Sequence, residues 1–114
     1  MTDANAAARE TTMGPPEPAD LVAAAVMAVP GVADLHAGMF GEVATYLPGR
    51  RVPGIRIKAD GVTEVHVTLF YGVPVRDGAA RVRDAAAAVV GGVVDVTVED
   101  VVAASDPVSD VSLP

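Results

Sequence analysis

Cysteine and tryptophan are absent from this chain of 114 residues, and phenylalanine and tyrosine occur only twice each. Without cysteine, the chain has no disulfide, no thiolate metal ligand and no cysteine nucleophile. About half of the residues are hydrophobic, and most of these are Ala and Val. Small side chains bury little apolar area, and each Å² contributes only about 25 cal/mol. We therefore expect a modestly stable core, which a second copy or a partner protein would stabilise further.

Basic residues are scarce as well. Eight Lys and Arg stand against fifteen Asp and Glu, and the formal net charge is -7. Because nucleic-acid affinity comes largely from Lys and Arg that neutralise phosphates, this balance argues against nonspecific nucleic-acid binding. Half of the basic residues are nevertheless clustered in one short stretch, namely Arg50, Arg51, Arg56 and Lys58.

A long hydrophobic run is missing too. The longest run, residues 21–29, has nine residues, whereas ~20 are needed to span a bilayer. The first residues also lack the basic stretch and the apolar core of a secretory signal. We expect a cytoplasmic protein that does not insert into a membrane, so a position at the inner face of the cell membrane would require a partner.

Composition divides the chain into one domain and two tails. Residues 1–18 are small or polar and end in a proline cluster, which predicts a disordered tail. Residues 104–114 combine Ser, Pro and Asp, which predicts a flexible acidic tail. The length between them allows one ordinary domain, which we place at residues 19–103.

The first element expected in this domain is a short helix over residues 21–29. Asp20 precedes the apolar run as a suitable N-cap, and Pro30-Gly31 follows it as a stop. Because almost every side chain of this helix is apolar, we expect it to be largely buried against a sheet or a second subunit.

Residues 32–49 allow two interpretations. Thr and Tyr alternate with apolar residues near the end of this segment, which favours a strand. Its apolar spacing would equally suit a short helix. We predict an extended segment, then a turn at Pro48-Gly49. Pro53 indicates that the next strand starts at or just after it.

Alternating side chains predict a long strand within residues 61–75. One face carries Val65, Val67, Leu69, Tyr71 and Val73, and the other carries Glu64, His66, Thr68 and Phe70. A two-residue loop before this strand would place Ile57 opposite Glu64, with the apolar faces in disagreement. A three-residue loop at 59–61, with its glycine at positive φ, places Ile57 opposite Thr63. Because a one-residue slip turns every side chain to the other face, the pattern predicts the longer loop, with Arg56 opposite Glu64.

A second helix is expected over residues 75–90, begun by Pro74 and closed by Gly91-Gly92. Its apolar positions share one helical face: Val75, Ala79, Val82, Ala86 and Val89. A last strand follows, in which Val94, Val96 and Val98 alternate with polar residues.

These elements predict a small α+β fold. We expect a two-layer α/β sandwich in the order α-β-β-β-α-β, with the helices on one face of a mostly antiparallel sheet. The expected core comprises Leu21, Val26, Ile55, Ile57, Val65, Val67, Leu69, Val82, Val89, Val96 and Val98.

Residues suited to catalysis are few. His66 shares a solvent-facing strand surface with Glu64, but zinc needs three or four clustered ligands, and no spacing supplies them. His36 is expected in a loop. The serines lie only in the predicted acidic tail, where nothing would form an oxyanion hole. Residues 49–54 lack the Gly-Lys-Ser/Thr ending of a phosphate loop. We predict no catalytic residue, no cofactor and no metal site, and we expect the chain not to be an enzyme.

Several short motifs follow one another along residues 20–102. They are VPGV (29–32), GIRI (54–57), Tyr71-Gly72 at the end of the long strand, the helix VRDGAARVRDAAAAVVGG (75–92) and the strand VVDVTVEDV (93–101). In this order they resemble the alkaline shock protein family, envelope stress response proteins of Gram-positive bacteria. The abundance of Ala, Val, Arg and Asp is typical of an actinobacterial member.

The resemblance implies a small cytoplasmic α/β domain that self-associates and is held near the cell membrane by an integral-membrane anchor protein. Loss of such proteins perturbs envelope homeostasis, so we expect a non-enzymatic scaffold or interaction module and a homo-oligomer. The alternative is a small RNA-binding domain, favoured by the basic cluster but opposed by the net charge and by the lack of a GXXG loop. An enzyme has the least support.

The segment TYLPGRRVPG (45–54) departs from the family pattern. It and the following strand supply our candidate partner-binding residues, which are Tyr46, Arg50, Arg51 and Arg56. A turn needs Pro and Gly for its geometry, but it does not need two adjacent arginines. Arginine binds carboxylates or phosphates with two parallel hydrogen bonds, so this corner is suited to docking an acidic segment of a partner or of a second copy. The other interpretation is a solvated loop.

Overall fold

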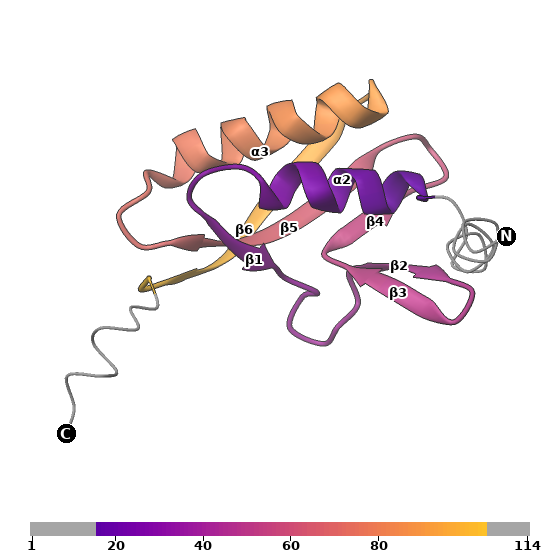
Figure 1. The fold of residues 1–114 in the computed structure, drawn as a ribbon, viewed down its shortest axis with the longest axis horizontal. Coiled ribbons are helices and arrows are strands. Elements are labelled where there is room, and N and C mark those ends of the chain that lie inside the picture. The colour runs from indigo at the N-terminus through magenta and orange to yellow at the C-terminus, as the bar shows by residue number, and fades with distance from the viewer. Residues whose placement is uncertain (1–15, 105–114) are drawn as a thin grey trace, which may run out of the picture.

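Within the described part of the chain, the two helices lie on the same face of the main sheet (Figure 1). The computed structural model describes residues 16–104, so most of each predicted tail lies outside the described residues. Its elements are α2 (Pro18–Met27), β1 (Val32–Leu35), β2 (Ala44–Leu47), β3 (Arg50–Pro53), β4 (Ile55–Ile57), β5 (Thr63–Phe70), α3 (Val75–Val90) and β6 (Val94–Val102). The predicted class, a small α+β fold with a mostly antiparallel sheet, is confirmed.

Five strands separate the two helices, where the sequence predicted three. The stretch 32–49, predicted as one extended segment, divides into β1 and β2, and β3 follows at once. Pro48-Gly49 forms the predicted turn, a two-residue loop that pairs Leu47 with Arg50. Proline presets the first turn position and glycine takes a positive φ of 76° at the second, which is typical of a type II turn.

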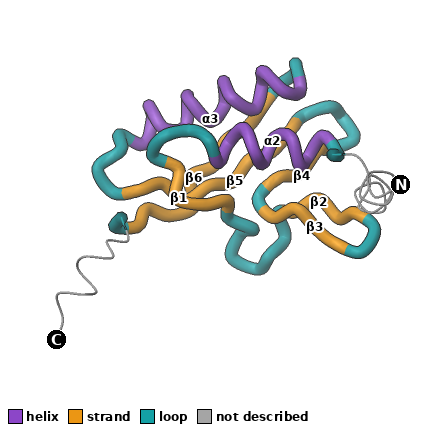
Figure 2. Tube along the Cα trace, viewed as in Figure 1, coloured by secondary structure: helices purple, strands orange, loops and turns teal. Residues whose placement is uncertain are grey.

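Strand β5 is the centre of the main sheet (Figure 2). Along one edge, the first half of β5 pairs antiparallel with β4, and the second half pairs antiparallel with β1. Along the other edge it pairs with β6 in parallel. A parallel neighbour requires a long crossover connection, and α3 supplies it. The sheet therefore contains one parallel pair among antiparallel ones.

The predicted three-residue loop between β4 and β5 is confirmed. Ile57 pairs with Thr63 and Arg56 pairs with Glu64. The Lys58 amide donates to the carbonyl oxygen of Val62 at 2.9 Å, which closes the loop. Its glycine has the expected positive φ of 91°. Side-chain alternation alone was sufficient to fix this register.

Gly54 lies where β1, β4 and β5 meet. Its φ is 80°, and a Cβ there would lie 2.8 Å from the Cβ of Leu35 and 2.9 Å from the carbonyl oxygen of His66. That oxygen accepts the His36 amide, while the His66 amide donates to the Gly54 carbonyl. Only glycine allows the backbone this close approach.

The start of α2 differs from the prediction. Asp20 is not the N-cap; the helix begins at Pro18, and Glu17 is the N-cap. Asp20 lies in the first turn, where its carboxylate accepts the Glu17 amide at 2.8 Å. The amide of a residue at the first helical position has no partner within the helix, so proline, which has no amide hydrogen, is favourable there. The helix therefore begins about one turn before the apolar run. The helix ends at Met27, just before the predicted stop.

Helix α3 has the predicted bounds and ends at Gly91, whose left-handed conformation caps it. Its buried face is shifted from the prediction: Gly78, Val82 and Ala86 are buried, whereas Val75 is exposed. A Cβ on Gly78 would lie 2.8 Å from Leu69, so glycine lets the helix approach the sheet closely.

The core between the helices and the sheet is made of small residues, as expected. It comprises Ala19, Val22, Val26, Val32, Val52, Ile55, Val65, Val67, Leu69, Val82, Ala86 and Val94. Val96 and Val98 are only partly buried against it. Three predicted core residues, Leu21, Ile57 and Val89, are instead exposed. Tyr71 is exposed too, because β5 ends at Phe70.

No helix within residues 16–104 is long and apolar enough to cross a membrane.

Candidate interaction surfaces

An open apolar groove lies where the start of α2, the end of α3 and the β4–β5 hairpin come together. Its volume is about 430 Å³, and its lining comprises Pro16, Pro18, Leu21, Ile57, Gly61, Thr63, Val89 and Val90. Thr63 is the only lining residue with a polar side-chain atom. A surface of this chemistry is suited to an apolar side chain and offers no acid or base.

The three mispredicted core residues all line this groove. Leu21 is 48% exposed, Ile57 40% and Val89 38%. Each comes from a different element: Leu21 lies in the first half of α2, Ile57 ends β4 and Val89 lies one residue before the end of α3. Periodicity grouped them correctly with apolar neighbours, but their side chains line an opening at the surface. The groove is therefore an extension of the core that opens to the surface.

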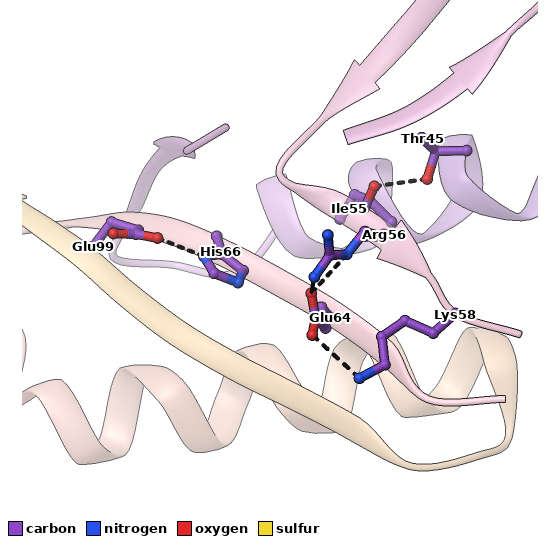
Figure 3. A network of polar contacts seen from close by, with 7 residues as sticks. All are labelled: Thr45, Ile55, Arg56, Lys58, Glu64, His66 and Glu99. Atoms are coloured by element: carbon purple, nitrogen blue, oxygen red, sulfur yellow. Dashed lines mark hydrogen bonds and ion pairs between the residues drawn. The ribbon is translucent and has the colours of Figure 1, made fainter. Parts of the chain in front are cut away.

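A polar network lies on the outer face, which we define as the face of the main sheet turned away from α2 and α3 (Figure 3). Two guanidinium nitrogens of Arg56 lie 2.7 and 2.9 Å from one carboxylate oxygen of Glu64. The Lys58 ammonium lies 3.4 Å from the other oxygen. Partial burial by itself would raise the pKa of Glu64, but the hydrogen bonds and charges of Arg56 and Lys58 outweigh it and lower that pKa.

His66 also lies on the outer face, but it is less solvent-facing than predicted, since its side chain is 16% exposed. Its Nδ1 lies 2.5 Å from a carboxylate oxygen of Glu99. Glu99 occupies a bulge in β6, because Val67 pairs with Val98 and Thr68 pairs with Asp100. No three His, Cys, Asp or Glu side chains cluster as metal ligands in the described part of the chain. His36 lies just after β1, where its Nδ1 accepts the Gly38 amide.

The candidate partner-binding residues separate into two locations. Tyr46, Arg50 and Arg51 lie on the β2–β3 hairpin, where Tyr46 pairs with Arg51 and both are exposed. Arg51 reaches the Gly41 carbonyl at 3.4 Å. Arg56 lies instead on the outer face, paired with Glu64. The structure therefore brings three of the four together.

Arg50 has a partner within the chain. Its two terminal nitrogens lie 2.7 and 2.8 Å from the two carboxylate oxygens of Asp20. The hydrogen bond from Arg50, together with the Glu17 amide, lowers the pKa of Asp20 to about 2. The same contact raises the pKa of Arg50. This ion pair ties the hairpin to the first turn of α2, so Arg50 has a structural role that its position in a turn did not reveal.

Sequence reasoning did not predict the groove. Its lining comes from four segments spread over more than seventy residues, and no local pattern connects them. Comparisons with protein-family models, with curated proteins and with solved structures give no match. The family resemblance drawn from the motifs accordingly stays a prediction.

Proposed function

We propose that this chain is a non-enzymatic interaction module that binds a protein partner through the apolar groove. The observation that carries the proposal is the convergence of Leu21, Ile57 and Val89 from three elements on one opening. Large apolar side chains that gather on the surface of a small domain favour contact with another protein. The lining favours an apolar anchor residue of that partner over a polar substrate.

We extend the proposal to a cellular role: a cytoplasmic, homo-oligomeric scaffold of the envelope stress response, recruited to the inner face of the cell membrane by an integral-membrane partner. The order of the sequence motifs supports this role through the family resemblance. The groove would supply the contact with the partner, and the exposed hairpin with Tyr46 and Arg51 offers a second contact surface.

The ion pairs favour a protein partner over RNA. Three of the four clustered basic residues have carboxylate partners within the chain: Arg50 pairs with Asp20, while Arg56 and Lys58 pair with Glu64. A basic side chain whose charge is already neutralised adds little to phosphate binding.

Partner recovery by immobilised variants tests the groove. Val89 lies near the C-terminus of α3, where a cation is favourable, so Val89→Lys should retain the fold. Its exposed neighbour Ala88 provides the matched control, Ala88→Lys. With the membrane fraction of the native cells, we expect Val89→Lys to recover at least about tenfold less partner, since a buried charge without a pair opposes binding.

Equal recovery by Val89→Lys and Ala88→Lys would remove the groove from the proposal. A parallel Tyr46→Ser/Arg51→Ser variant tests the hairpin. Loss of recovery in that variant alone would move the binding surface to the β2–β3 hairpin.

A further inference from the structure

We infer that the apolar groove of one copy of this chain binds the tip of the loop 36–43 of a second copy, with Met39 and Phe40 as the residues that enter it. The inference rests on the proposed function and deepens it, because it identifies a protein that the groove binds as another copy of the same chain. Since tip and groove are different surfaces, each copy carries both, and the copies join head to tail.

The tip of this loop carries the most exposed pair of adjacent large apolar side chains in the described part of the chain. Phe40 is 87% exposed and Met39 is 82% exposed. Single apolar residues are common on protein surfaces. Two adjacent ones of this size at the end of a loop indicate contact with another molecule.

Hydrogen bonds within the loop hold the tip in place. The Gly41 amide donates to the Gly38 carbonyl at 3.2 Å, which closes a turn with Met39 and Phe40 at its central positions. The Phe40 amide donates to the Glu42 carboxylate at 3.0 Å. Because the loop is already ordered, binding of its tip loses little conformational entropy.

The tip and the groove lie on different sides of the same molecule. In Figure 1, the loop 36–43 extends below the main sheet, whereas the start of α2 and the end of α3, which line the groove, lie above it. A copy in this conformation cannot place its own tip in its own groove. A tip that fills the groove therefore comes from a second molecule.

Size and chemistry of the two surfaces agree. The groove volume of about 430 Å³ lies within the range of about 300–1,000 Å³ that is typical of binding pockets. Its lining is apolar apart from Thr63. An aromatic ring supplies a large apolar area, and the flexible thioether of Met39 adapts to the irregular space beside it.

The charges beside the two surfaces are complementary. Arg51 reaches the loop at the Gly41 carbonyl, and it forms no ion pair among residues 16–104. Two acidic residues flank the groove: Glu17 lies between two lining prolines, and Asp60 precedes the lining Gly61. The basic residues near the groove, Arg50 and Lys58, already have carboxylate partners. A free guanidinium beside the tip thus meets carboxylates beside the groove, as a head-to-tail contact between copies requires.

Complementation between two variants tests the contact. Met39→Ser/Phe40→Ser removes the tip and keeps the groove, whereas Val89→Lys blocks the groove and keeps the tip. By sedimentation at up to about 1 mM protein, where a small interface is expected to associate, the mass of the unaltered chain should rise well above 11.5 kDa. Each variant alone should stay a monomer, and an equimolar mixture should form dimers and nothing larger.

The mixture forms dimers because one variant supplies the groove and the other the tip. The matched controls, Tyr71→Ser and Ala88→Lys, change exposed residues elsewhere and should associate like the unaltered chain. An unaltered chain that stays monomeric overturns the inference. So does a mixture that stays monomeric, because an interface formed by the same surface of both copies is not restored by mixing.

Disulfide formation between separate chains tests the contact without a charged variant. The chain has no cysteine, so a Phe40→Cys chain mixed with a Val89→Cys chain contains only the two thiols of interest. Their mixed disulfide should form at least about tenfold faster than that between Tyr71→Cys and Val89→Cys, since binding raises the effective concentration of the thiols. Equal rates overturn the inference. A single chain with Phe40→Cys and Val89→Cys that forms an intrachain disulfide when dilute contradicts it as well, because the tip would then fill its own groove.

These measurements use no other protein, so they separate the inference from the proposed function. If mixing fails while Val89→Lys still loses its partner from the membrane fraction, the groove binds a different protein and only the inference is wrong. If mixing succeeds while Val89→Lys recovers as much partner as Ala88→Lys, the groove serves self-association and the membrane partner binds elsewhere.

Discussion

The two faces of β5 carry different kinds of side chain and contact different neighbours. Toward the helices, Val65, Val67 and Leu69 are fully buried. On the outer face, Glu64 forms an ion pair with Arg56 of β4, and the His66 ring lies within hydrogen-bond distance of the Glu99 carboxylate of β6. One face of this strand is therefore apolar and the other is charged, because successive side chains point to opposite faces of the sheet.

The difference lies in what each face loses when one side chain is removed. A buried apolar side chain leaves a cavity that close-packed neighbours fill only partly. A partly exposed ion pair loses a Coulomb attraction that water and salt already weaken. The covered face should therefore dominate the free energy of unfolding, and the outer face should contribute little.

The largest expected effect is on the covered face. Leu69→Ala should lower the free energy of unfolding by about 2–5 kcal/mol, because it removes a fully buried side chain packed near Gly78. Tyr71→Ala, two residues along but 82% exposed, should change it by less than about 0.5 kcal/mol. Urea denaturation measures both. Similar values for the two variants would contradict the layered description.

The next largest effect on the free energy of unfolding is expected at Gly54, a backbone position and not a side chain of either face. Gly54→Ala should cost about 2–3 kcal/mol, because it combines a positive φ with close contacts to Leu35 and His66. Gly49→Ala provides the control: its φ is also positive, but nothing lies within 4 Å of the added Cβ, so about 1 kcal/mol is expected. If the two variants unfold at the same urea concentration, the close approach at Gly54 has no energetic weight.

A smaller effect is expected on the outer face. Arg56→Ala should lower the free energy of unfolding by about 0.2–1 kcal/mol, and less in high salt. Arg83→Ala, at an exposed position of α3, is the comparison. Thermal unfolding at low and high ionic strength measures the difference. A loss as large as that of Leu69→Ala would show that the charged face is as important as the core.

The smallest effect depends on pH. Asp20 has a pKa of about 2 in the folded protein, below its ordinary 3.8. A lowered carboxyl pKa stabilises the fold above the ordinary value, and this stabilisation is lost as pH falls toward the folded value. The Tm difference between the unaltered chain and Asp20→Asn should therefore be constant above pH 5 and shrink between about pH 4 and pH 2.

Arg50→Ser should remove most of this pH dependence, since Arg50 is its main cause. A Tm difference that stays constant down to pH 2 would mean that the Asp20–Arg50 pair does not form in solution.

Local patterns determined much of this fold. The β4–β5 register, the bounds of α3 and the burial of Val65 and Val67 followed from alternation, glycine placement and helical spacing. These features depend on residues close in sequence, whose geometry is fixed by backbone sterics. The strands within residues 32–53 were harder to predict, because β1, β2 and β3 have only four residues each. Four residues hold two periods of alternation, which is too few to exclude other structures.

The sequence by itself determined which residues are apolar, which stretches after residue 54 are helix or strand, and that no cysteine chemistry is available. Only the tertiary structure decided that Leu21, Ile57 and Val89 line an open groove, although their spacing assigned them to the core. It also decided that Arg50 reaches Asp20, thirty residues away. Burial and ion pairing depend on neighbours brought together by folding, and periodicity along the chain carries no information on where those neighbours end.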